Sequence, residues 1–139
     1  MDHSLTLLAR ARKAQKDEDY NEAIRYAQLA FEIIDAPENR RLGALMVMAQ
    51  CFRRKHDFHR MLEVAVQGTS LSHFGDYYRI EFENLAAMGE FQLEQERQAI
   101  ARLRSVLAQD ISEIDQQRTQ QILSRMEAAF AEFDDTSNA

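Results

Sequence analysis

The sequence predicts an all-α fold built from helix pairs that repeat along the chain. Composition gives the first indication, because the 139 residues include only four glycines and one proline. Such a composition favours helices joined by short loops over a sheet. Periodicity gives the second: three segments, beginning at Ala23, Met61 and Ala99, carry apolar or small residues at i, i+1, i+4, i+7 and i+8, which is one stripe of a helix. The interval is 38 residues, and a recurrence of about 20–50 residues is typical of a solenoid.

The first repeat unit is expected to contain two helices. Residues 4–16 carry apolar residues at helical spacing and form the first. The second covers residues 20–34, and Asp19 is suited to cap it by accepting a hydrogen bond from a free N–H at its start. Pro37 then suits the first turn of the following helix.

The second and third units follow the same plan, and a seventh helix comes after them. Helices are expected over residues 37–55 and 58–70, over 76–91 and 95–108, and over 113–133. Ser112 followed by Asp115 resembles a capping box at the start of the seventh helix. We expect this helix to cover the third unit and residues 134–139 to form a flexible polar tail. A single domain therefore covers residues 1–133, with repeats at about 4–37, 42–75 and 79–109 and a capping helix at about 112–133.

The repeat carries a family resemblance. The first helix of the second unit reads Leu45-x-x-Met48-Ala49-x-x-Phe52, and the second helix of the first unit places Ala23, Ala27 and Ala30 on one stripe. These segments resemble the tetratricopeptide repeat (TPR), with W-x-x-L-G-x-x-Y in its first helix and A-x-x-x-F-x-x-A in its second. The resemblance implies a TPR-like α-α superhelix, a right-handed solenoid of about seven helices in this chain.

The third unit fits the TPR pattern only if its first helix is shifted relative to its second. It offers Phe82-x-x-Leu85-Ala86-x-x-Gly89, and joining this segment to the next helix requires about one extra residue near Glu94. The 38-residue interval also exceeds the 34 residues usual for the family, consistent with an extra turn on the first helix of each pair. The competing interpretation is an unrelated helical bundle with a similar apolar stripe.

Bulk properties exclude several classes of function. The net charge of −6 argues against non-specific binding to nucleic acid. Apolar runs fall short of the roughly 18 residues that a membrane span needs, and the N-terminus lacks the basic and apolar stretches of a secretory signal. One cysteine, Cys51, cannot form an internal disulfide. We therefore expect a cytoplasmic protein that binds neither nucleic acid nor membrane and is a monomer or weak homodimer.

Residues that could carry chemistry are few. Cys51 lies in the middle of a predicted helix, far from the helix N-terminus that would activate a thiol, so we expect a buried structural cysteine. His56-x-x-His59 suggests a metal by its spacing, but a tetrahedral site needs at least three protein ligands and the sequence offers no third. The alternative is a pair of exposed histidines at a turn. Phosphate-binding and hydrolase motifs are absent from the sequence, so we expect no cofactor, no metal and no enzymatic activity.

The TPR resemblance implies a concave groove lined by the first helix of each pair. Arg binds carboxylates in bidentate fashion, so cations in this groove predict a protein or peptide partner with acidic and apolar residues. The alternative is that these cations only keep exposed helix faces soluble. Arg102 and Arg104, on the second helix of the third pair, are expected to lie away from the groove. The expected groove residues are Leu5, Leu8, Arg12, Lys16, Met46, Val47, Gln50, Arg53, Arg54, Glu83 and Asn84.

These expectations favour a protein–protein interaction module that acts as an adaptor, scaffold or chaperone. Size, acidity and three repeats are similar to those of the TPR chaperones of type III secretion. The alternative is a regulatory or sensor TPR domain at the N-terminus of a larger signalling protein.

Overall fold

A computed structural model describes residues 3–73 and 77–137, with side chains up to residue 132. Seven helices and no strand are found within these residues, so the predicted all-α fold is confirmed. Residues 134–137, expected in a flexible tail, continue the last helix, and residues 138–139 lie outside the described part. The helices are α1 (His3–Lys16), α2 (Tyr20–Phe31), α3 (Glu38–Arg54), α4 (Phe58–Leu71), α5 (Tyr77–Gln92), α6 (Glu96–Leu107) and α7 (Glu113–Ser137).

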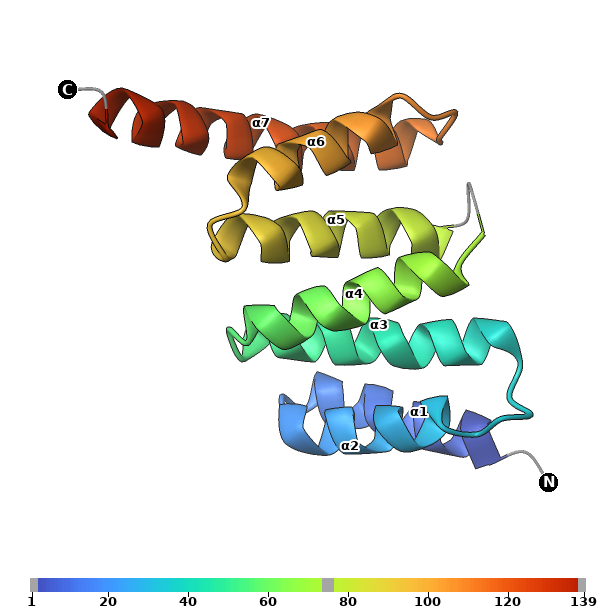
Figure 1. Cartoon of the computed structure of the whole chain (residues 1–139). Coiled ribbons are helices and arrows are strands. Elements are labelled where there is room, and N and C mark those ends of the chain that lie inside the picture. The colour runs from blue at the N-terminus through green and yellow to red at the C-terminus, as the bar shows by residue number, and fades with distance from the viewer. Residues whose placement is uncertain (1–2, 74–76, 138–139) are drawn as a thin grey trace.

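The helices form two layers, with consecutive helices packed as neighbours (Figure 1). The first helices of the pairs contact one another in chain order, α1 with α3, α3 with α5, and α5 with α7. The second helices α2, α4 and α6 form the other layer, and each packs between two helices of the first. Helix α7 therefore occupies the place that the first helix of a fourth pair would take.

The turn within each pair is the same structure three times. Its central residue has a left-handed backbone, with φ of 61° at Glu18, 58° at His56 and 65° at Glu94. The following residue donates its N–H back across the turn to the carbonyl five residues earlier, the bond that closes a Schellman-type helix end. These bonds are Asp19 N to Ala14 O (2.8 Å), Asp57 N to Phe52 O (2.9 Å) and Gln95 N to Glu90 O (2.8 Å).

This repeated turn corrects the register of the third unit. The left-handed residues are spaced by 38 positions in both intervals, so the extra residue expected near Glu94 is absent. Consequently Glu83 occupies the position of Leu45, and Glu90 that of Phe52. The apolar pattern instead predicts Phe82 at the position of Leu45, and that alignment is wrong by one position.

Caps at the helix starts follow the sequence well. The Asp19 carboxylate accepts a hydrogen bond from the N–H of Glu22 at 3.4 Å, which confirms the predicted cap of α2. The Ser112 hydroxyl oxygen accepts from the N–H of Asp115 at 3.2 Å at the start of α7. Helix α2 ends at Phe31, three residues earlier than expected, in the approach to Pro37, where the chain must leave the helical conformation.

Small residues at equivalent positions bring the layers together. Ala11, Ala49 and Ala87 follow one another at the 38-residue interval, and each is fully buried. In the second helices, Ala27 and Ala65 are equally buried, as the repeat stripe predicts. Small side chains let helix backbones approach closely, which explains why alanine recurs at the first position in all three units. At the second position the third unit has Leu103 instead.

Candidate functional site

The corrected register moves the groove positions of the third pair. Glu81, Asn84, Leu85, Met88 and Phe91 now correspond to the groove positions of α1 and α3, since each lies 38 residues after its counterpart in α3. Asn84 keeps a place in this set. Glu83 does not, because its side chain points toward α6.

Glu83 belongs to a charge cluster inside the third pair, which we call the α5–α6 charge triad of Glu83, Glu90 and Arg102. Arg102 Nε donates to Glu90 Oε1 at 2.7 Å, and Arg102 Nη1 donates to both carboxylate oxygens of Glu83 at 3.3 Å. Glu90 is only 1% exposed. Burial alone would lower the pKa of Arg102, but the bond to Glu90 and the charge of Glu83 outweigh it and raise that pKa. Arg102 therefore stabilises the third pair and is unsuited as a control for charge reversal.

One half of the expected groove is closed by side chains. A Cβ at Gly43 would lie 3.1 Å from Arg12 Nη2, 3.3 Å from Leu8 Cδ2 and 3.5 Å from the Tyr78 hydroxyl, so side chains from α1 and α5 both cover this end of α3. Helix α3 packs against α1, α2, α4 and α5, and its residues from Leu42 to Ala49 are all buried. The expected contact of a partner with Leu8, Met46 and Val47 is therefore wrong, since all three are buried. Leu5 remains 55% exposed.

The other half of the groove is open and begins with a cationic depression. This depression has a volume of about 400 Å³, and its three cations outnumber its one carboxylate, Glu18. Its lining residues are Gln15, Lys16, Glu18, Tyr20, Gln50, Arg53 and Arg54. Gln15 Nε2 donates to Gln50 Oε1 at 2.7 Å, which ties α1 to α3 beneath the cations. The structure thus brings together three of the four predicted cations, and Arg12 lies apart beside Gly43.

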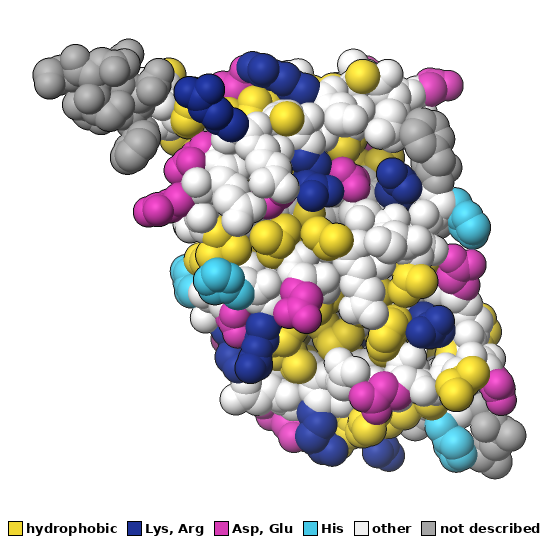
Figure 2. All heavy atoms as spheres, viewed as in Figure 1, with side chains coloured by type: hydrophobic (Ala, Val, Ile, Leu, Met, Phe, Trp, Pro, Cys, Tyr) yellow, Lys and Arg dark blue, Asp and Glu magenta, His cyan; other side chains and the backbone are white. Residues whose placement is uncertain are grey.

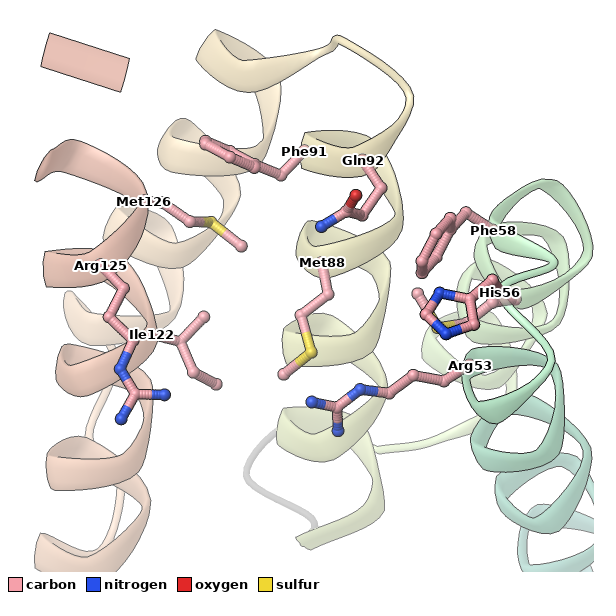
Figure 3. A pocket seen from close by; sticks show the side chains of 10 residues that line it. Arg53, His56, Phe58, Met88, Phe91, Gln92, Ile122, Arg125 and Met126 are labelled. Carbon is pink, nitrogen blue, oxygen red and sulfur yellow. The ribbon is translucent and has the colours of Figure 1, made fainter. Parts of the chain in front are cut away.

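An apolar cavity of about 350 Å³ follows between the end of α3, the start of α4, α5 and α7 (Figure 3). Arg53 and Arg125 stand on opposite sides of it, and Met88 projects between them from α5 (Figure 3). Because Arg53 also lines the cationic depression, the two hollows adjoin. The apolar walls are formed by Phe58, Met61, Met88, Phe91, Ile122 and Met126.

A polar compartment of about 300 Å³ lies beside the apolar cavity and shares Arg53, Met88, Ile122 and Arg125 with it. Asn84 lines this compartment and is 2% exposed. Its Oδ1 accepts a hydrogen bond from the Thr119 hydroxyl at 3.2 Å, but its Nδ2 is buried without a partner among the described residues. A buried donor left unpaired costs free energy, so this amide can gain from a ligand oxygen.

Two arginines in the open half of the groove lack the carboxylate partners that arginines on the opposite face have. Arg53 and Arg125 form no ion pair with any described residue, and both are exposed. Arg118 is bound to Glu81 at the edge of the polar compartment, which raises the Arg118 pKa. Arg53 and Arg125 are therefore the groove cations whose charge no described carboxylate pairs with, whereas Glu81 neutralises Arg118.

The opposite face, formed by α2, α4 and α6, mixes charges of both signs with apolar side chains (Figure 2). Its arginines are engaged: Arg25 pairs with Glu22 at 2.9 Å, and Arg60 with Asp57 at 3.6 Å. The hydrogen bond from Arg25 lowers the pKa of Glu22. A hollow between α2, α3 and α4 on this face is apolar at its base, but its cations already have partners.

Sequence reasoning missed the contribution of α7. Arg125 and Ile122 were not assigned to the groove, because α7 was expected only to cover the third pair. Met88 was missed because of the one-residue shift in register. The repeated turn signal at Asp19 and Asp57, followed at the same interval by Gln95, could have fixed that register from the sequence.

Residues considered for chemistry take structural places. Cys51 is buried, as predicted, and burial raises the pKa of its thiol from 9.0 to about 11. His56 and His59 are exposed, and the His56 ring meets Phe58 edge-on at 5.7 Å. Among the described residues, no group of three or more His, Cys, Asp or Glu side chains is placed to hold a metal ion. Within the same residues, each helix is either too short or too polar to cross a bilayer.

Comparisons with protein-family models, with curated proteins and with solved structures find no match to this chain.

Proposed function

We propose that this chain is a TPR-like interaction module that binds a partner polypeptide in the open half of the groove, as an adaptor, scaffold or chaperone in the cytoplasm. The 38-residue repeat of the turns and the recurring buried alanines support the kinship with TPR proteins. Binding, rather than catalysis, is supported by a buried thiol whose pKa burial raises to about 11, which keeps it protonated.

One observation carries the proposal: the cationic depression, the polar compartment and the apolar cavity adjoin along the layer of α1, α3, α5 and α7. Arg53 lines all three hollows and links them into one surface. Unpaired arginines beside apolar walls match a polypeptide segment that carries carboxylates and apolar side chains. Arg is also among the residues enriched at the centres of protein interfaces.

The test compares two pairs of charge reversals. Arg53→Glu with Arg54→Glu changes the groove, and both side chains are exposed, so the helical circular dichroism should persist. The matched control, Arg60→Glu with Arg97→Glu, makes the same change in net charge on the opposite face. Both control sites lie in the first turn of a helix, where the helix dipole favours a carboxylate.

Proteins captured from a cell extract by tagged wild-type chain and by both variants are then compared by cross-linking and quantitative mass spectrometry. We expect a partner that the groove variant loses and the control variant retains. If the two variants capture the same proteins as the wild type, or if the control variant alone loses the partner, the groove is not the recognition surface.

A further inference from the structure

We infer that the groove binds an internal peptide segment with two parts in a fixed order, a bulky apolar anchor in the cavity between α3, α5 and α7 and carboxylates over the polar compartment and the cationic depression. This inference rests on the proposed function. It adds where in the groove the apolar side chain and the carboxylates of the partner bind, and it assigns the anchor site to residues of α5 and α7.

The apolar part follows from the walls of the cavity. Met88, Ile122 and Phe91 are each only partly buried, although all three are large and apolar. Methionine side chains adapt their shape to what they contact, and Met88 and Met126 both face this hollow. A volume of about 350 Å³ is small for a ligand pocket and suits a single large side chain with part of its backbone.

The acidic part follows from the donors next to the cavity. Arg53 and Arg125 flank it, and the unpaired Nδ2 of Asn84 lines the adjoining compartment. A carboxylate placed there would accept from both a guanidinium and the amide, and it would relieve the cost of the unpaired donor. On the side of α1, Lys16 and Arg54 extend the same positive charge. The acid sites therefore begin beside the anchor cavity and continue from there toward α1.

An internal segment fits better than a chain terminus because the groove continues past the acid site. The polar compartment shares Gln50 and Arg53 with the cationic depression, so a bound chain can run on toward α1. Neighbouring helices lie about 8–10 Å apart, so the far side of the cationic depression, on α1, lies about 10–20 Å from the apolar cavity. An extended chain covers that distance in about three to six residues.

The first experiment selects peptides that bind the folded wild-type chain from a random library displayed on phage. The peptides have about twelve residues, because an extended chain of about 3.3 Å per residue then spans the whole groove. We expect enriched peptides to share one bulky apolar residue and at least two acidic residues, about three to six positions apart. An enriched peptide is then synthesised with blocked ends and its affinity is measured by fluorescence anisotropy. Replacing its apolar anchor by alanine should weaken binding at least about tenfold.

Two variants of the protein test the acid site and the anchor site separately. Arg53→Gln should weaken binding about tenfold at about 0.1 M salt and have much less effect at about 1 M, where the screening length falls to about 3 Å. Ile122→Gln should weaken binding by about tenfold at both salt concentrations, because it acts on apolar burial. The matched controls Arg60→Gln and Val66→Gln, on the opposite face, should leave the affinity within about twofold of the wild type.

The outcomes distinguish this inference from the proposed function. Enriched peptides that are basic, that lack the apolar anchor, or that bind Arg53→Gln and Ile122→Gln as tightly as the wild type overturn the two-part assignment and leave a peptide-binding function in place. Equal binding of end-blocked and free-ended peptides supports an internal segment, whereas a requirement for a free carboxyl terminus overturns it. A selection that enriches no peptide overturns the proposed function and this inference with it.

Discussion

At the scale of single residues, the α5–α6 charge triad shows how the third unit differs from the second. Buried ion pairs pay a large desolvation cost, and apolar residues of similar volume often serve stability equally well. The second unit illustrates the apolar solution at the equivalent positions. There the triad of Glu83, Glu90 and Arg102 is replaced by Leu45, Phe52 and Val64, at an interval of 38 residues.

Removing one member of the triad should lower the free energy of unfolding far more than replacing all three by apolar residues. Arg102→Met leaves Glu90 buried without its cation and should cost about 3–5 kcal/mol of unfolding free energy. The triple variant Glu83→Leu, Glu90→Phe and Arg102→Val copies the second unit and should be neutral or more stable by up to about 4 kcal/mol. Urea unfolding followed by circular dichroism measures both. A triple variant as unstable as Arg102→Met would mean that the third pair depends on its charges.

At the scale of helices, the sequence predicts the elements well but not which side of α5 faces the groove. Helix bounds follow from apolar spacing, from Asp19 and from Pro37, because these signals act within a few residues. The register of the third unit depended on an apolar match, and Glu83 and Glu90 break the apolar pattern through a pairing with Arg102 that only the folded chain reveals. Burial of Leu8, Met46 and Val47 likewise depends on the packing of α1 and α5 against α3, which the sequence does not show.

The contact of α4 with α5 gives a prediction at this scale. A Cβ at Gly68 would lie 2.4 Å from Cγ of Phe82, whose ring is fully buried. Gly68→Ala should therefore lower the unfolding free energy by about 1–3 kcal/mol, although alanine is the better helix former by about 1 kcal/mol.

Gly43→Ala is the matched control for this change. Its nearest neighbour is the flexible end of Arg12, at 3.1 Å, so the variant should be neutral or slightly stabilised. Chemical denaturation of Gly68→Ala, Phe82→Leu and the double variant then gives the coupling free energy. Additive losses in the double variant would argue that the two residues are not in contact.

At the scale of the whole molecule, α7 has two roles. Leu123 and Met126 are 4% and 6% exposed and pack with Ile100 and Leu103 of α6, so α7 covers apolar surface that the third pair would otherwise leave open. The same helix supplies Ile122 and Arg125 to the apolar cavity. The sequence predicts the first role from the end of the repeat, since a terminal unit needs a cover. It does not predict the second, because the repeat pattern alone does not fix which face of α7 meets the groove.

Deleting residues 111–139 should therefore affect stability and binding together. Burial of Leu123 and Met126 is worth about 1.5–3 kcal/mol each, and such a loss corresponds to a fall in melting temperature of about 10 °C or more. The exposed surface of α6 should also make the truncated chain associate, which light scattering measures. Arg125→Gln separates the roles, because this exposed side chain contributes little to folding and should weaken peptide binding without changing the melting temperature. A truncated chain that stays monomeric and melts with the wild type would show that the third pair needs no cover.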